Sequence, residues 1–158
     1  MGGAMGKLGF IILTLLVATV GYAQTYKTYY PWESDSVLVA WSIQKFVDNN
    51  ATFMAVDKKK EKIPKENSIN SSNSDLRRTA RFTAFEMTLH HYKVKPNGCT
   101  TELKRLIRVL EMTPWKKQEF EDIVAFEEKF VALFPQNIED NNLTKVFDYI
   151  DNYCKEKK

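Results

Sequence analysis

Two arginines and a lysine carry the charge that an anion site would need. Arg78 and Arg81 are three residues apart in a segment with a helical pattern, so their side chains would share one face. Lys45 belongs to an earlier segment and could line the same pocket. Because guanidinium groups bind tetrahedral oxyanions in a fork geometry, this pattern predicts an oxyanion pocket. The alternative is that these side chains are solvated charges near the start of a helix.

Glu86 and His90 are four residues apart, a spacing that places both side chains on one face of a helix. A carboxylate and an imidazole so placed can share a divalent metal ion. Such a site would need at least one further ligand from elsewhere in the chain. The alternative is a surface pair that binds nothing.

Asp35 could act as a ligand-binding carboxylate or as the cap of a helix that begins beside it. A metal-assisted enzyme could use Asp35, Glu86 or His90 as acid–base groups. The sequence contains no G-x-S-x-G elbow and no glycine-rich phosphate loop, so nucleophilic and nucleotide chemistry have little support. Whether the protein is an enzyme therefore stays open.

Two cysteines, Cys99 and Cys154, lie far apart in the sequence. In an oxidising compartment they could form a disulfide, or they could remain two buried thiols. Neither has a second cysteine or a histidine at the spacing of a zinc site. The sequence leaves the pairing open.

The first 23 residues have the features of a secretory signal peptide. Lys7 supplies a positive charge, residues 9–20 are apolar, and Gly21 and Ala23 are the small residues that precede a cleavage site. The apolar stretch of 12 residues is shorter than the roughly 17 to 25 residues of a membrane-spanning helix. We therefore expect an exported protein with no membrane span after cleavage.

The remaining residues, 24–158, have the composition of an ordinary globular domain. Over the whole chain of 158 residues, 44% are hydrophobic and 27% are charged, and the length fits one domain. The formal net charge of +3 is too small to indicate nucleic-acid binding. We expect a single domain with no nucleic-acid partner.

The spacing of apolar residues predicts a mainly α fold: one compact domain of about five helices with a minor short-strand element. Thr100 or Thr101 would cap the third helix, and Pro114 would begin the fourth. The expected elements are helices over 34–48, 76–92, 100–110, 113–134 and from 142 onward, and a strand over 52–56.

Two segments lie outside the expected helices. Residues 57–75 combine a lysine-rich run with many Asn and Ser residues, which predicts a mobile polar loop. The aromatic run Tyr26–Trp32 looks extended, because a proline disfavours helix at the residue before it. This run could serve as an arm that contacts another protein, which would make the chain a protein-interaction domain.

The segment 33–57, ESDSVLVAWSIQKFVDNNATFMAVD, carries a family pattern. Its Asp35, Trp41 and Lys45 stand where that pattern has Asp, Trp and Arg, and Ile-x-Lys-Phe-Val-Asp runs in register. Thr-Ala-Phe-Glu at 83–86 is similar to a later Cys-Thr-Phe-Glu element of the same family. The chain thus resembles the C-terminal domain of the chromate-resistance protein B family, which includes exported, stand-alone members.

The resemblance implies a helical fold and places Trp41 among the ligand-binding residues. The chain departs from the family at a His-x-Gly-x-x-Cys element, where Arg78, Ala80 and Thr83 stand instead. If that His and Cys bind a metal ion or act in redox sensing, this chain lacks both groups. Lysine at 45 keeps the positive charge of the family's arginine but not its fork geometry.

These patterns predict an exported, chromate-resistance-like protein that binds an oxyanion or a divalent metal ion, or serves as an accessory to such binding. A protein-interaction domain and a metal-assisted enzyme are the alternatives. The predicted ligand-binding residues are Asp35, Trp41, Lys45, Arg78 and Arg81, and the predicted metal ligands are Glu86 and His90.

Overall fold

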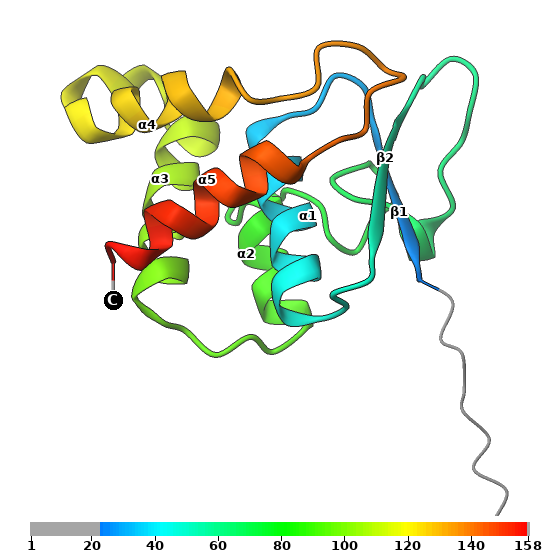
Figure 1. Cartoon of the computed structure of the whole chain (residues 1–158), viewed down its shortest axis with the longest axis horizontal. Helices are drawn as coiled ribbons and strands as arrows, with labels where there is room; N and C mark the ends of the chain where they lie inside the picture. Colours follow the sequence, from blue (N-terminus) through cyan, green and yellow to red (C-terminus); the bar gives the residue numbers. More distant parts are fainter. Residues whose placement is uncertain (1–22, 158) are drawn as a thin grey trace, which may run out of the picture.

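A computed structural model describes residues 23–157 of the chain (Figure 1). The mainly helical prediction is confirmed: the described part contains five α-helices, two short 3₁₀ helices and one small two-stranded sheet. Nearly all of the predicted signal peptide lies outside the described residues. Within them, no helix is both long and apolar enough to cross a membrane.

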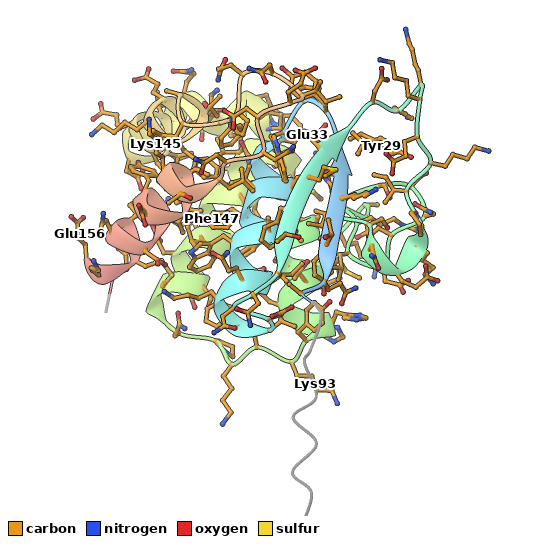
Figure 2. The ribbon with its side chains drawn as sticks, turned by 45° about the vertical axis from the view of Figure 1, so that its right-hand side comes forward. Tyr29, Glu33, Lys93, Lys145, Phe147 and Glu156 are labelled. Atoms are coloured by element: carbon orange, nitrogen blue, oxygen red, sulfur yellow. A yellow bond between two sulfur atoms is a disulfide. The ribbon has the colours of Figure 1, made fainter. Side chains whose placement is uncertain are left out.

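The sheet consists of β1 (Thr25–Tyr29) and β2 (Thr52–Val56), which run parallel in register from Thr25 opposite Thr52. Parallel neighbours need a crossover connection, and α1 (Ser34–Phe46) provides it. Figure 2 shows Tyr29 and Glu33 at the end of the sheet where β1 leads into this helix. The predicted strand over 52–56 is therefore confirmed.

Helix α1 is the centre of the core. Every residue from Asp35 to Ile43 is buried, in agreement with the wide apolar face that the sequence indicates. The helix packs against α2 (Ala84–His91), and Phe85 of α2 is fully buried beside it. In Figure 1 the other three α-helices lie on one side of this pair and the two-stranded sheet lies on the other.

The prediction of a helix from residue 76 is wrong for its first half, because α2 begins only at Ala84. Thr83 and Glu86 form a reciprocal capping box at this point, which satisfies backbone N–H groups that an uncapped helix start would leave unpaired. The side chain of Phe82 is 47% exposed, although its spacing to Phe85 and Leu89 in the sequence predicts one shared apolar face. Arg78 and Arg81 consequently lie on an irregular segment and not on a helix face.

The C-terminal half contains three helices: α3 (Gly98–Met112), α4 (Glu121–Val131) and α5 (Thr144–Lys155). Asn97 caps α3, and Thr100 supports the cap from the third helical position. The predicted helix over 113–134 is divided into a 3₁₀ helix, Pro114–Glu119, and α4.

The polar segment 57–75 contributes more to the core than its composition indicates. Ile63 and Ile69 are buried, and a short 3₁₀ helix, Lys65–Asn67, lies between them. Ser68 and Ile69 form isolated bridges to Lys27 and to Leu76, respectively. Two isoleucines in a polar run are enough to anchor this segment beside the sheet.

The proposed contact arm is part of the folded domain. Tyr26 and Trp32 are buried members of the core cluster, and β1 accounts for most of the run between them. Between these ends Tyr29 and Tyr30 are half-buried and Pro31 is exposed. A run held at both ends does not project as an arm, so the interaction-domain alternative loses most of its support.

Candidate functional site

The predicted site residues fall into separate places. Trp41 and Lys45 line one cavity, whereas Asp35 and Arg78 meet at the N-terminal end of α2. His90 lies exposed in the last turn of α2. Arg81 is exposed on the irregular segment before α2, where its carbonyl oxygen accepts a hydrogen bond from Arg108.

Asp35 is a helix cap, but for α2 and not for the helix in which it lies. Its two carboxylate oxygens accept hydrogen bonds from the backbone N–H groups of Ala84 (2.7 Å) and Phe85 (2.8 Å). The expectation that it caps its own helix is wrong, since Glu33 occupies the cap position of α1. Burial raises the pKa of Asp35 to about 6, although both N–H donors and the nearby Arg78 oppose that rise.

Arg78 is surrounded by carboxylates. Its guanidinium lies 2.7 Å from Glu111, 3.5 Å from Glu33 and 3.7 Å from Asp35. We call these four residues the Asp35 cluster. Burial raises the pKa of Glu111, and Arg78 opposes that rise. With three acids around one base, this cluster has no spare positive charge for an oxyanion.

Glu86 is engaged within the protein. One carboxylate oxygen contacts Thr83 in the capping box, and the other accepts a hydrogen bond from Arg108 at 3.0 Å. Helix geometry separates the N-terminal end of α2, where Asp35 binds, from His90 by about 9 Å at 1.5 Å per residue. Among residues 23–157, no group of three or more His, Cys, Asp and Glu side chains could hold a metal ion. The acid–base trio of the enzyme hypothesis is therefore not brought into one cleft.

A cavity of about 660 Å³ lies between the C-terminal half of α1, the start of α3 and the end of α5. Its size is within the range of small-molecule sites. We call it the disulfide pocket, because both cysteines line it. Its other lining residues are Trp41, Lys45, Phe46, Asn97, Gly98, Asp148, Asp151, Asn152, Lys155 and Lys157.

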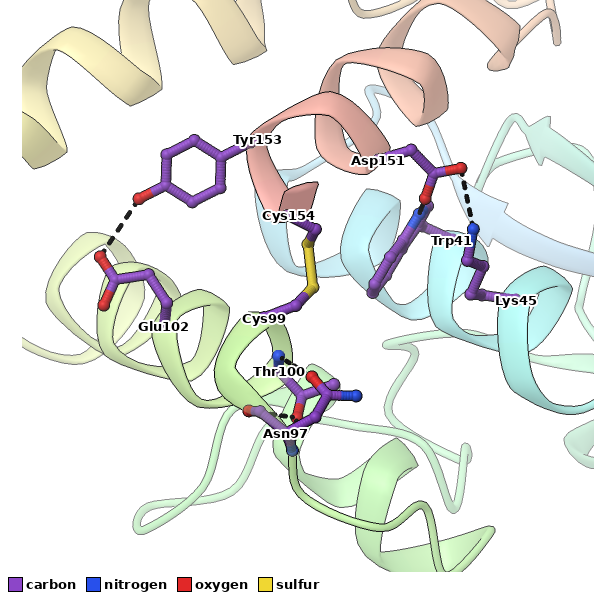
Figure 3. The surroundings of a disulfide bond; sticks show 9 residues. All are labelled: Trp41, Lys45, Asn97, Cys99, Thr100, Glu102, Asp151, Tyr153 and Cys154. Carbon is purple, nitrogen blue, oxygen red and sulfur yellow. Dashed lines mark hydrogen bonds and ion pairs between the residues drawn. A yellow bond between two sulfur atoms is a disulfide. The ribbon is translucent and has the colours of Figure 1, made fainter. Parts of the chain in front are cut away.

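Asp151 connects two predicted ligand residues across the pocket. One of its oxygens accepts a hydrogen bond from Trp41 Nε1 at 3.0 Å, and the other lies 3.0 Å from Lys45 Nζ. Figure 3 shows both contacts reaching from α1 to α5. Trp41 is also a core residue, because only 2% of it is exposed. Asp151 thus positions Lys45 at the pocket wall.

The disulfide between Cys99 and Cys154 settles the alternatives left open by the sequence. It joins the first turn of α3 to the last turn of α5, with a Cα–Cα distance of 4.8 Å (Figure 3). Beside it, a Cβ on Gly98 would overlap the backbone carbonyl of Lys157, so glycine is required at this close approach. These contacts hold the two helix ends together as one wall of the pocket.

Positive charge at the pocket exceeds negative charge by one lysine. Asp151 is balanced by Lys45, which leaves Lys155 and Lys157 against Asp148. Lys155 Nζ donates a hydrogen bond to Asn152, and Lys157 Nζ lies 5.0 Å from the centre of the Tyr153 ring. Neither contact neutralises the lysine.

Sequence reasoning missed Asn97, Asp151, Lys155 and Lys157. Trp41 and Lys45 at helical spacing are the local signal for this site, since both lie on one face of α1. Their partner lies more than a hundred residues away, and only tertiary packing brings it near. No spacing rule within one element could have indicated that contact.

Comparison with protein families confirms the resemblance found in the sequence. A family model described as ChrB, C-terminal domain, matches residues 27–155, and the chain belongs to this family. Membership associates the chain with chromate resistance. No curated protein and no solved structure matched the chain.

Two of the three positions at which the chain departs from the pattern lie at the N-terminal end of α2. Arg78 contacts Asp35 directly, and Thr83 caps the same helix end that Asp35 binds. The third, Ala80, is exposed on the irregular segment between them. The guanidinium of Arg78 and the hydroxyl of Thr83 are therefore both used in folding contacts.

Proposed function

We propose that this chain is an exported, chromate-resistance-related binding protein whose disulfide pocket takes a small oxyanion. The observation that carries the proposal is the meeting of Trp41, Lys45 and two further lysines around one open cavity. Lysine ammonium groups supply the positive charge, and the amides of Asn97 and Asn152 supply additional donors.

The disulfide pocket suits an anion better than the Asp35 cluster does. Around Arg78 an anion would meet three carboxylates, and like charges at such distances repel one another. In the pocket, Asp151 is already paired, so an incoming anion meets a net positive wall. The candidate anion-binding residues are therefore Lys45, Lys155 and Lys157, in place of the two arginines.

An oxyanion is also better supported than a metal ion. The predicted metal pair is divided between a buried, paired carboxylate and an exposed imidazole. Two aspartates do line the pocket, but one of them is held by an indole and an ammonium group. A divalent cation would have to displace Lys45 before it could use that carboxylate.

The direct test is thermal unfolding of the purified protein against chromate, sulfate, phosphate and molybdate, with Mg²⁺ and Zn²⁺ as the metal arm. A ligand that binds only the folded state stabilises it by about 2.7 kcal/mol at 100 times its dissociation constant. We expect a saturable rise in the unfolding temperature with at least one oxyanion. A response to metal ions alone, or to none of these probes, would contradict the proposal.

Matched variants locate the binding site. Lys45→Met and Lys155→Met each remove one positive charge from the pocket and should weaken oxyanion binding by about tenfold, the effect of about 1.4 kcal/mol. Lys116→Met removes an exposed lysine outside the pocket and serves as the control. Equal affinities in all three variants would place binding elsewhere.

Export is tested separately from binding. Expression of the full chain with a C-terminal tag, followed by fractionation and intact mass measurement, should give an exported product that begins at Gln24. The reason is the small-residue cleavage pattern ending at Ala23. A full-length product retained inside the cell would contradict this part of the proposal and leave the binding test untouched.

A further inference from the structure

We propose that the Cys99–Cys154 disulfide is an exchangeable redox site, at which a small anionic thiol enters the disulfide pocket and attacks the sulfur of Cys154. The proposal goes beyond oxyanion binding and does not depend on it. It rests on three features: access to the bond, the opposite electrical ends of the two helices that carry it, and the lysines around it.

The bond is accessible from the cavity. Both cysteines line the disulfide pocket, and neither residue is fully buried. Figure 3 shows the sulfur–sulfur bond between the ends of α3 and α5, beside Trp41 of α1. A disulfide that lines a cavity can be reached by a small thiol, whereas one enclosed in a core cannot.

The two sulfurs lie in different electrostatic surroundings. Cys99 is the second residue of α3, whose N-terminal end carries a partial positive charge from its backbone N–H groups. Cys154 is the penultimate residue of α5, whose C-terminal end carries a partial negative charge. A thiolate is therefore better stabilised at Cys99 than at Cys154.

This asymmetry gives the exchange a direction. The incoming thiolate forms a bond to Cys154 Sγ, the Cys99–Cys154 bond breaks, and its electron pair leaves on Cys99 Sγ. A second thiolate of the same class then attacks the sulfur of the first one. The products are an oxidised small disulfide and the dithiol form of the protein, after two protons are taken up from water.

The charges at the pocket select an anionic thiol. Lys45 lies on α1, Lys155 is the last residue of α5 and Lys157 follows that helix, while the opposing acids are Asp148 and Asp151 on α5. Asp151 is paired with Lys45. On α3, Glu102 is held by Arg105 and Tyr153, which lowers its pKa and keeps its charge balanced. The remaining excess is positive, so carboxylates on the incoming thiol would be attracted.

The dithiol form should stay folded. Val146 and Ile150 of α5 are fully buried in the core, and the start of α3 still meets the Lys157 carbonyl at Gly98. The helices are therefore held by packing on both sides of the bond. Exchange can proceed without separating α5 from the domain.

The first experiment compares reduction of the oxidised protein by glutathione, which is anionic, and by cysteamine, which is cationic. Rates are compared at equal thiolate concentration, and free protein thiols are counted by alkylation and intact mass spectrometry. We expect glutathione to react at least fivefold faster, and we expect that preference to fall in Lys157→Met but not in the control Lys116→Met. Equal rates for the two thiols, or reduction no faster than global unfolding, would overturn the proposal.

The second experiment identifies the attacked sulfur. Partial reduction by glutathione is quenched with acid and alkylating agent, and the peptides are mapped. Glutathione should be found on Cys154 with the alkyl group on Cys99, and the reverse pattern would overturn the proposed direction. In Cys154→Ser the remaining thiol should be alkylated with a pKa below the ordinary value of about 8.5, unlike the remaining thiol in Cys99→Ser. The wild-type mapping decides the question if either single variant fails to fold.

Discussion

The Asp35 cluster and the disulfide pocket are built from similar side chains but use them in opposite ways. In the cluster, one arginine and three carboxylates contact each other and backbone N–H groups around a fully buried Asp35. In the pocket, three lysines and two aspartates surround open space, and only one ion pair forms between them. The first region uses its charges to hold helices together, whereas the second leaves charges facing a cavity.

The difference between the two regions shows that the type of a residue does not determine its role. Arg78 has the more specific chemistry for an oxyanion, yet its guanidinium is the partner of buried acids. Lys45 is the less specific group, yet it stands at a cavity wall. If the comparison is correct, variants of the cluster should mainly change stability, and variants of the pocket should mainly change binding and exchange.

The largest expected loss of stability tests how much the disulfide of the pocket contributes to the free energy of unfolding. Replacing both cysteines in Cys99→Ser/Cys154→Ser opens a loop with a sequence separation of 55 and should cost about 4 kcal/mol through the greater freedom of the unfolded chain. Urea unfolding of the variant and of the wild type measures this loss in the free energy of unfolding. A loss below about 1 kcal/mol would mean that the bond constrains the unfolded chain far less than its loop length predicts.

The next largest effect belongs to the cluster. Asp35→Ala removes the acceptor of two backbone N–H groups and the buried partner of Arg78, and should cost about 3 kcal/mol. Glu33→Ala is the matched control, because it removes an exposed carboxylate from the same arginine and should cost less than about 1 kcal/mol. Equal losses in the two variants would show that burial of Asp35 does not set its importance.

Sequence patterns predicted the fold well where apolar residues and their spacing decide the structure. The wide face of α1, the strand over 52–56 and the last helix all follow from that spacing. The start of α2 did not follow, because Leu76 and Phe82 continue a helical pattern in sequence. The helix begins only at Ala84, because the capping box of Thr83 and the carboxylate of Asp35 bind its first N–H groups. Of these two signals, only the Thr83–Glu86 spacing can be recognised in the local sequence.

The candidate site was predictable in part. Trp41 and Lys45 were identified, since both are near one another on a single helix and match a family motif. The sequence did not assign Asp151 or the two cysteines to the disulfide pocket, because long-range packing determines which helix end lies opposite α1. Arg78 was assigned by its chemistry, and its three acidic neighbours come from distant parts of the chain.

A smaller effect should appear in the pH dependence of stability. The pKa of Asp35 is about 6 in the folded protein against an ordinary value of 3.8. A raised folded pKa means that the native state holds the proton more tightly, so this contribution is full below about pH 4 and is lost as pH rises through about 6. Asp35→Asn lacks this titrating group, so the difference in free energy of unfolding between wild type and variant should fall as pH rises from 4 to 7. A pH-independent difference would contradict the raised pKa.

The smallest effect on stability is expected at the ion pair of the pocket. Lys45 and Asp151 have side chains that are 49% and 36% exposed, so Lys45→Met should change stability by less than about 0.5 kcal/mol. Asp151→Ala should cost about 1 kcal/mol or more, because it also leaves the buried Trp41 N–H without its acceptor. The order of these two losses in urea unfolding tests whether Asp151 holds the pocket wall while Lys45 contributes little to folding. If Lys45→Met were the more destabilising variant, the lysine would be a folding contact like Arg78, and the contrast between the two regions would fail.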